Sequence, residues 1–176
     1  MQFMVKKSSR LEKCKKIKLI LTDVDGVLTD GGRYFSKSGE VSKKFHVRDG
    51  MGVNILLRNN IKTVIITKEN SSIVKRWGKE MNISKIYSNS INKESKLEKI
   101  CKLFNVTSNE IAFIGDDVND LKLLKLIGFS ATPNDSVNIV KNNVDYICNK
   151  NGGEGAFREV VDLILEKKLD KQINWY

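Results

Sequence analysis

The chain has 176 residues, of which 40% are apolar, and a formal net charge of +10. This length fits a single domain with a sizeable core, and the sequence contains no apolar run of 18 or more residues that would predict a transmembrane helix. Its 31 basic residues are scattered and not interleaved with a stripe of aromatic side chains, which favours a solvated surface over a nucleic-acid interface. We therefore expect neither a membrane nor nucleic acid as a partner.

The amino-terminal segment, residues 1–16, is basic and lacks the apolar core of a signal peptide. We expect it to form a leader that frays or lies on the surface of a cytoplasmic protein. The three cysteines are widely spaced, which matches neither a disulfide framework nor a zinc site. Cys101 and Cys148 lie in apolar periodic contexts and are expected in the core, whereas Cys14 is expected to be exposed, with no evident role.

The first predicted strand, residues 17–22, is a short apolar run that ends at two carboxylates. Asp23 and Asp25 lie two residues apart, so in an extended segment both side chains point to one place beyond the strand. Two like charges so close together require a cation or a shared proton, and the pair therefore predicts a metal site or an acid/base dyad. Open α/β sheets bind ligands at this end of their strands.

A β-hairpin is predicted next, with strands at 33–36 and 41–47 around a turn at 37–40, and it would project over the carboxylate pair. Beyond it, helical and strand patterns alternate, which predicts an α/β domain with a doubly wound parallel sheet over residues 17–168, followed by a tail at 169–176. In the first helix Val53, Leu56 and Leu57 are expected to face inward. The predicted helices are 48–60, 72–81, 93–104, 119–127, 137–142 and 156–168, and the further strands are 62–67, 85–87, 110–114, 129–131 and 146–148.

Polar residues gather where the predicted strands end. They are Asp23 and Asp25, Thr67, Lys93 at the start of a helix, and Asp116, Asp117 and Asp120. This set suits Mg²⁺ and a phosphoryl group, because carboxylates bind a hard cation while a hydroxyl and an ammonium hold phosphate oxygens. The sequence lacks GxxxxGK[ST] and GxGxxG, and its single histidine, His46, lies in the hairpin region, so a P-loop, a dinucleotide site and a Ser-His-Asp triad are disfavoured.

The order and spacing of DVDGVLTDGG, IIT, a downstream lysine and GDDVND resemble the haloacid dehalogenase superfamily of phosphatases. Within it, DGVLTDGG, FHVRDGMG, GDDVNDLKLL and GGEGAFREV are similar to the 3-deoxy-D-manno-octulosonate 8-phosphate phosphatases and their sialic-acid-type 9-phosphate relatives. The resemblance covers residues 17–165. It implies a Rossmann-like fold with a short hairpin flap, about residues 33–47, and no large cap domain. It also implies a phosphoric monoester hydrolase that uses Mg²⁺ and an acidic sugar phosphate.

The resemblance also implies a division of labour between the two carboxylates. Asp23 would attack phosphorus and form an aspartyl-phosphate, while Asp25 would protonate the leaving sugar oxygen and then activate water. Mg²⁺ would be held by the Asp23 carboxylate, the backbone carbonyl of Asp25 and Asp116.

Further residues are assigned by the same resemblance. Thr67 and Lys93 would bind phosphate oxygens, and Lys96, one turn later, competes with Lys93 for that role. Asp117 and Asp120 would orient Lys93 and metal-bound water, or would mainly complement the dipole at the start of a helix. For the glycines of GGEG and for the arginine that follows them, a tight turn and a substrate loop both remain open.

In the relatives a homotetramer brings the hairpin of one subunit over the active site of a neighbour, so residues 33–47 are expected to form an interface. Arg48 resembles the octulosonate enzymes and would pair with the carboxylate or phosphate of the substrate. Glu69 resembles the nine-carbon branch instead, but the basic residues which that branch uses in the next helix are here Trp77 and Glu80. We therefore favour 3-deoxy-D-manno-octulosonate 8-phosphate, with an N-acetylneuraminate or deaminated 9-phosphate as the alternative.

Two different classes of protein are also considered. A non-catalytic domain of the same fold that serves assembly would be expected to lack Asp23 or Asp116, and both are present. A nucleic-acid phosphatase is suggested by the net charge of +10 and predicts tight, salt-sensitive binding of oligonucleotides.

Overall fold

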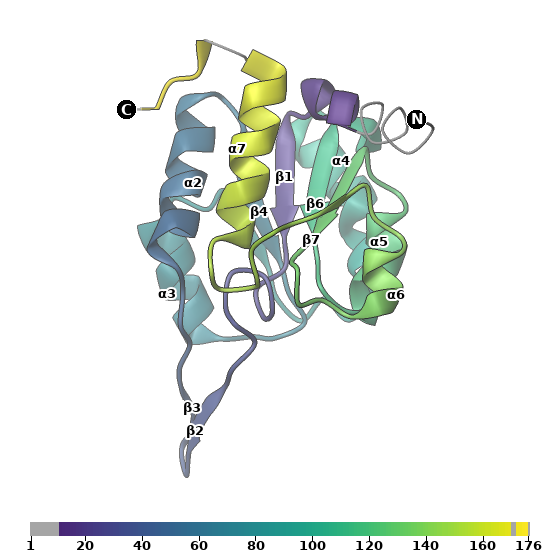
Figure 1. Ribbon diagram of the computed structural model, residues 1–176. Coiled ribbons are helices and arrows are strands. Elements are labelled where there is room, and N and C mark those ends of the chain that lie inside the picture. The colour runs from purple at the N-terminus through teal and green to yellow at the C-terminus, as the bar shows by residue number, and fades with distance from the viewer. Residues whose placement is uncertain (1–10, 170–171, 176) are drawn as a thin grey trace.

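The centre of the molecule is a six-stranded parallel sheet (Figure 1). The computed structural model describes residues 11–169 and 172–175. In spatial order the strands are β5 (Lys85–Tyr87), β4 (Lys62–Ile66), β1 (Leu19–Thr22), β6 (Ile111–Ile114), β7 (Phe129–Thr132) and β8 (Tyr146–Ile147). All residues of β1 and β6 are buried, as expected for central strands of a sheet that is covered on both faces. The predicted α/β fold with a doubly wound parallel sheet is confirmed.

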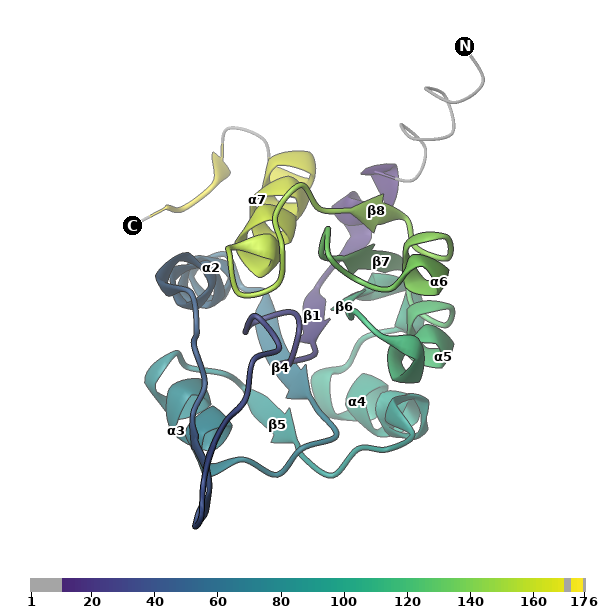
Figure 2. The same cartoon turned by 60° about the horizontal axis from the view of Figure 1, so that its bottom comes forward.

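Helices cover both faces of the sheet and divide the core in two (Figures 1 and 2). On one face lie α2 (Val47–Arg58), α3 (Ser72–Glu80) and α7 (Ala156–Leu169), and on the other lie α4 (Leu97–Phe104), α5 (Leu121–Leu124) and α6 (Asn138–Lys141). Alternation along β1 serves both cores, because Ile20 belongs to the first and Leu19 and Leu21 to the second. The chain therefore needs an unbroken apolar run at β1, which is what its sequence provides.

Several predicted boundaries shift by a turn or less. The helix predicted at 93–104 begins as a 3₁₀ turn, η2 (Lys93–Lys96), before α4, and the one predicted at 119–127 is divided into η4 (Val118–Asp120) and α5. A third 3₁₀ turn, η3 (Ser108–Glu110), precedes β6. In α2, Val53 and Leu56 are buried as predicted, but Leu57 is 40% exposed, so that prediction is wrong. The helix lies against β4 and α7, and the third inward position is Ile55 instead.

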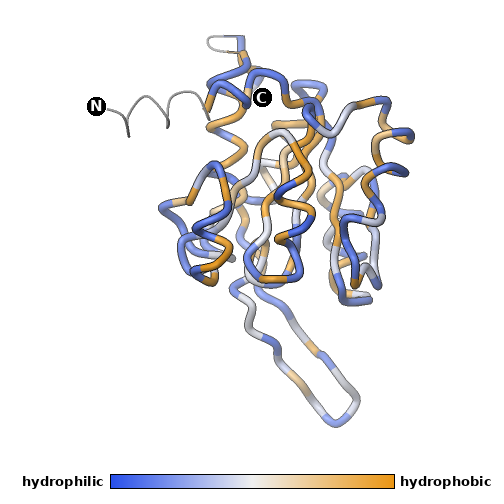
Figure 3. Tube along the Cα trace, turned by 90° about the vertical axis from the view of Figure 1, so that its right-hand side faces the viewer, coloured by the Kyte–Doolittle hydropathy of each residue, from blue (hydrophilic) through white to orange (hydrophobic). Residues whose placement is uncertain are grey.

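The predicted hairpin is present and projects beyond the body of the domain (Figures 1 and 3). Its strands are β2 (Tyr34–Ser36) and β3 (Gly39–Ser42), with a register shift between Tyr34 and Phe35. The second strand is shorter than predicted, because Phe45 forms an isolated bridge to Thr29 and α2 already begins at Val47. The hairpin is an open ribbon with three exposed large apolar side chains, Tyr34, Phe35 and Val41.

The two ends of the described chain pack onto the domain. A 3₁₀ turn, η1 (Glu12–Lys16), lies against α7, and Cys14 is fully buried in the first core, so the expectation of an exposed Cys14 is wrong. Burial raises the pKa of its thiol to about 12. Cys148 is buried as predicted, whereas Cys101 is only partly buried. Residues 1–10 of the predicted leader lie outside the described residues.

The described part of the tail, residues 172–175, contacts α2. The side chain of Asn59 donates to the Asn174 carbonyl and accepts from the Asn174 amide, both at 2.9 Å. The Arg58 guanidinium donates to the Trp175 carbonyl at 3.2 Å, and the Arg158 guanidinium lies over the Trp175 ring. Among the helices that the structure describes, none combines the length and the apolar character needed to cross a membrane.

Candidate active site

The carboxyl ends of three neighbouring strands, β4, β1 and β6, lie side by side at one edge of the sheet (Figure 2). Residues of the loops that follow these strands line one cavity. Asp23, Thr67 and Asp116 follow these strands, so the parallel sheet brings together residues that are far apart in the sequence. The cavity has a volume of about 260 Å³. It is lined by Asp23, Asp25, Gly26, Gly31, Thr67, Lys68, Glu69, Asp116, Asp117 and Asn119.

The loop after β1 aims the two predicted carboxylates. The carbonyl of Val24 accepts hydrogen bonds from the backbone amides of Val27, Leu28 and Thr29, which curls the chain into a tight turn. The side chain of Val24 is fully buried, while Asp23 and Asp25 on either side of it line the cavity. The two residues thus line one cavity, as the prediction requires, although the chain forms a turn at this point and not an extended strand.

Lys93 lies beneath the cavity between two aspartates. Its ammonium group is fully buried and lies 2.6 Å from Asp23 Oδ2 and 2.6 Å from Asp120 Oδ1. Burial alone would lower the pKa of Lys93, but the two carboxylates outweigh that effect and raise the pKa. Burial raises the pKa of Asp23 to about 7, against the opposing effect of Lys93. This geometry favours Lys93 over Lys96 as the lysine of the site.

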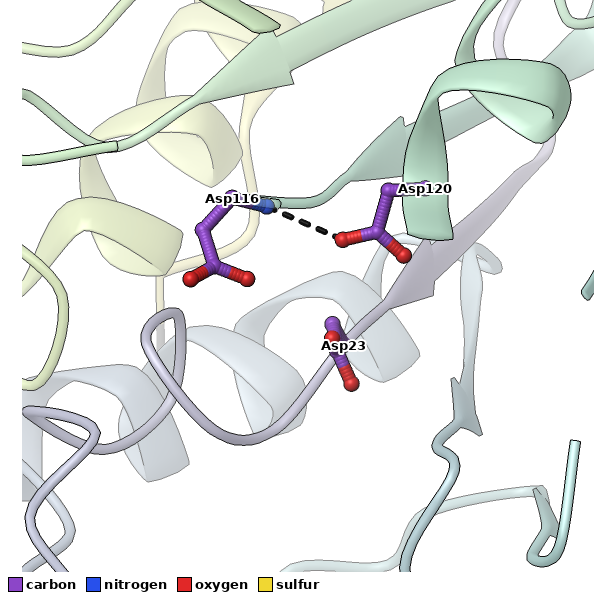
Figure 4. A group of neighbouring side chains, drawn as sticks. All are labelled: Asp23, Asp116 and Asp120. Carbon is purple, nitrogen blue, oxygen red and sulfur yellow. Dashed lines mark hydrogen bonds between the residues drawn. The ribbon is translucent and has the colours of Figure 1, made fainter. Parts of the chain in front are cut away.

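Asp120 orients the loop that carries Asp116 (Figure 4). Its Oδ1 accepts from Lys93, and its Oδ2 accepts from the backbone amide of Asp116 at 3.0 Å and from that of Asp117 at 3.5 Å. Both oxygens are thus engaged, which agrees with the orienting role expected for Asp120. Asp117 is more exposed, and its carboxylate accepts from the amide of Val118 at the start of η4.

Asp116 presents an oxygen that lacks a partner. Its Oδ1 is buried and makes no hydrogen bond, and burial together with the charges of Asp23 and Asp120 raises its pKa to about 8. Oxygens of Asp23, Asp116 and Asp120 lie within 4.8 Å of one another. A buried carboxylate without a partner is costly, and a hard divalent cation with oxygen ligands would stabilise it. The residues present therefore fit Mg²⁺, with Asp23 and Asp116 as the available carboxylate ligands.

Glycines allow the surrounding loops to approach this site. Gly26 has φ +84°, and a Cβ atom there would lie 2.1 Å from Asp116 Oδ2. A Cβ atom at Gly152 would lie 2.1 Å from the carbonyl oxygen of Gly26, and Gly153 donates its amide to the Val27 carbonyl at 3.0 Å. The GGEG segment therefore packs directly on the loop that carries Asp23 and Asp25. This close packing explains why glycine, which has no Cβ atom, occupies these positions.

Two predicted substrate residues lie in different places. Glu69 lines the cavity, where its backbone amide donates to Thr67 Oγ1 at 3.2 Å and its carboxylate lies 3.5 Å from Arg33 Nη2. Arg48 is exposed and lines a separate cavity of about 650 Å³ next to α7, together with Arg158. Within one chain the structure does not bring Arg48 to Asp23, and its contact with substrate stays a prediction.

Sequence reasoning missed Lys43. Its side chain is fully buried, and its ammonium group forms ion pairs with Asp25 Oδ1 and, at 3.0 Å, with Glu40 Oε1. The pair Lys43-Lys44 offered one signal, since adjacent residues of an extended segment point to opposite sides. Which of the two faces the site depends on the path of the hairpin, and that path cannot be read from the residue pattern.

The fold and the cavity define an α/β enzyme with an acidic active site built for a divalent cation. The model of a family described as haloacid dehalogenase-like hydrolase matches residues 53–160. The chain is 38% identical over 155 residues to the 3-deoxy-D-manno-octulosonate 8-phosphate phosphatase KdsC of Haemophilus influenzae, an alignment that covers 88% of this chain and 86% of the relative. The chain belongs to the haloacid dehalogenase-like hydrolase family, as its motifs predicted.

Solved structures of relatives share the fold. The cobalt-bound phosphatase from Haemophilus influenzae superposes with a TM-score of 0.87 at 38% identity, covering 89% of this chain and 91% of that one. The phosphatase from Moraxella catarrhalis, in complex with magnesium, phosphate and a 3-deoxy-D-manno-octulosonate (KDO) molecule, superposes with a TM-score of 0.88 at 37% identity, covering 92% of each chain.

Proposed function

We propose that the chain is a magnesium-dependent phosphatase that hydrolyses 3-deoxy-D-manno-octulosonate 8-phosphate. The observation that carries this proposal is the grouping of Asp23, buried Lys93 and the unpartnered Asp116 Oδ1 at one strand edge. The relatives from Haemophilus influenzae and Moraxella catarrhalis, at 38% and 37% identity, support the substrate. A domain that serves only assembly would not need to retain this charged group.

The proposed chemistry proceeds in two halves. In the first, an Asp23 oxygen forms a bond to phosphorus while the bond from phosphorus to the sugar oxygen breaks, and the Asp25 carboxyl group gives its proton to that oxygen. In the second, Asp25 takes a proton from water, the water oxygen attacks phosphorus, and the Asp23 carboxylate leaves. Lys93 and Thr67 hold phosphate oxygens. Mg²⁺, when bound, neutralises charge on the phosphoryl group.

Two side chains of α3, the helix after β4, favour the eight-carbon substrate. Trp77 of α3 stacks on Phe45 with ring centroids 4.6 Å apart, and Glu80 pairs with Arg76 at 3.1 Å. Neither offers a cation for a nine-carbon acid, whereas Glu69 in the cavity is the feature that favours the alternative 9-phosphate.

A phosphate-release assay with a panel of substrates tests this function. The panel holds 3-deoxy-D-manno-octulosonate 8-phosphate, N-acetylneuraminate 9-phosphate, its deaminated analogue and hexose phosphates, each with Mg²⁺ or with EDTA. We expect the octulosonate ester to give the highest kcat/KM, and EDTA to abolish turnover. Preference for a 9-phosphate would establish the alternative substrate, and a lack of turnover of any acidic sugar phosphate would refute the proposal.

We further infer that the enzyme is a homotetramer in which the hairpin of one subunit covers the cavity of a neighbour. Tyr34 and Phe35 are 56% and 61% exposed on a two-stranded ribbon, which is marginal in water without a partner. Light scattering after size-exclusion chromatography should give four times the mass of the chain, and Phe35→Ser should lower it. A wild-type monomer at micromolar concentration would contradict the inference.

A further inference from the structure

The position of the proposed acid/base group, Asp25, depends on a single side chain. Asp23 is held at both oxygens, because Oδ1 accepts the Val24 amide at 2.7 Å and Oδ2 pairs with Lys93. For the Asp25 carboxyl group, by contrast, Lys43 is the only hydrogen-bond donor among the described residues. The Asp25 side chain is also 25% exposed, so without Lys43 little else would fix its direction.

Lys43 is itself held from several sides. Its ammonium group also pairs with Glu40, whose carboxylate accepts from Arg33 Nε at 3.1 Å and from Ser71 Oγ at 3.0 Å. Arg33 lies just before β2, Glu40 in β3 and Ser71 just before α3. The network therefore joins both arms of the hairpin and the start of a helix to the Asp25 carboxyl group.

The backbone on either side of Lys43 is anchored as well. Two residues later, Phe45 forms the bridge to Thr29 and stacks on Trp77. Thr29 belongs to the same tight loop that carries Asp25, because its amide donates to the Val24 carbonyl. The base of the hairpin and the catalytic loop thus form one unit, and Lys43 is the charged link inside it.

We propose that Lys43 is a positioning residue for the reaction, which holds the Asp25 carboxyl group in place and makes that placement depend on the base of the hairpin. The proposal rests on the proposed phosphatase function, in which Asp25 transfers protons. Burying the Lys43 ammonium group costs free energy, and its ion pairs with Asp25 and Glu40 offset that cost only while both carboxylates are in place. Fixing a reacting group accurately repays such a cost, because small displacements of catalytic groups lower rates strongly.

The main test is Lys43→Met, which keeps the length of the side chain and removes its charge. We expect kcat to fall by about 10–100-fold, as for a misplaced catalytic group, while KM changes less than about threefold. Affinity for Mg²⁺, measured by calorimetry, should stay the same because Asp23 and Asp116 are untouched. The matched control is Lys102→Met, which removes an exposed ammonium 2.6 Å from Glu98, outside the hairpin, and should leave kcat unchanged.

A double-mutant cycle with Asp25→Asn shows whether Lys43 acts through Asp25. Single-turnover measurements with radiolabelled substrate are sensitive enough to quantify the low activity of Asp25→Asn. If Lys43 acts through Asp25, Lys43→Met costs less than about threefold in that background, because groups that act as a unit are not additive. An equal loss in both backgrounds would show that Lys43 binds substrate directly or only supports the fold, and would overturn the proposal.

Two further measurements test the role of Lys43 independently of the proposed substrate. If the wild-type enzyme leaves the octulosonate ester intact, the proposed substrate fails, but the cycle is still run with p-nitrophenyl phosphate. A crystal structure of Lys43→Met gives a readout that requires no activity. We expect the Asp25 carboxyl group to be displaced or to occupy more than one position, whereas an unchanged carboxyl group would overturn the proposal.

Discussion

Replacement of Asp23 by asparagine is expected to lower kcat by about 10³–10⁵-fold, the scale of a lost nucleophile. The amide keeps the size of the side chain and its acceptor for the Val24 amide, but it does not attack phosphorus and it weakens the pairing with Lys93. Phosphate release measures the rate. Acid quenching with radiolabelled substrate should trap phosphate on the wild-type protein and none on the variant.

The matched control for this experiment is Asp135→Asn. Asp135 is exposed, does not line the cavity, and accepts the Gly152 amide through Oδ1, which asparagine retains. We expect wild-type kinetics for this variant. A wild-type rate for Asp23→Asn, or labelling of that variant by phosphate, would refute the covalent mechanism.

Replacement of Lys93 by methionine should cause both loss of activity and loss of stability. The substitution leaves Asp23 and Asp120 buried without their shared cation, and breaking a buried ion pair in this way typically costs about 3–5 kcal/mol. We expect the free energy of unfolding, measured with urea, to fall by about that amount, and kcat to fall by about 10²–10³-fold because a phosphate-binding charge is lost. Added Mg²⁺ should restore part of the stability, since it supplies positive charge beside Asp23.

Lys96→Met provides the comparison for Lys93, because it removes the competing lysine one turn away. Lys96 is partly exposed, and no ion pair of it occurs in the described part of the chain. Its replacement should change stability by less than about 0.5 kcal/mol, as is usual for surface positions. A loss of activity in Lys96→Met with full activity in Lys93→Met would reverse the assignment.

The sequence predicts those site residues that come directly after the end of a strand. Asp23, Thr67 and Asp116 come immediately after buried runs, and parallel strands place such residues at one edge. The errors in the predicted helix boundaries have local causes. The 3₁₀ turns η2 and η4 run directly into the α-helices that follow, so the residue pattern does not separate turn from helix. The fold was predictable because apolar patterns typical of strands and of helices alternate along the chain.

The parts that the sequence does not predict depend on contacts between distant segments. Cys14 is buried because η1 folds back onto α7, and nothing in the basic run around it indicates that contact. Lys43 reaches Asp25 across 18 positions of chain through the bend of the hairpin. Arg48 was expected beside the substrate; within one chain α2 places it next to α7, and its contact with substrate stays a prediction. Each case requires the direction of a loop, which residue types alone do not determine.

The charge at the floor of the cavity differs in sign from that of the whole protein. The chain carries a net +10, but at this point three carboxylates, those of Asp23, Asp116 and Asp120, face the single ammonium group of Lys93. Burial and the neighbouring carboxylates raise the pKa values of Asp23 and Asp116, so a divalent cation that binds here displaces protons as well as cancelling negative charge. We therefore expect the metal ion to bind before the substrate, because it removes the remaining like charge that a phosphate ester would meet.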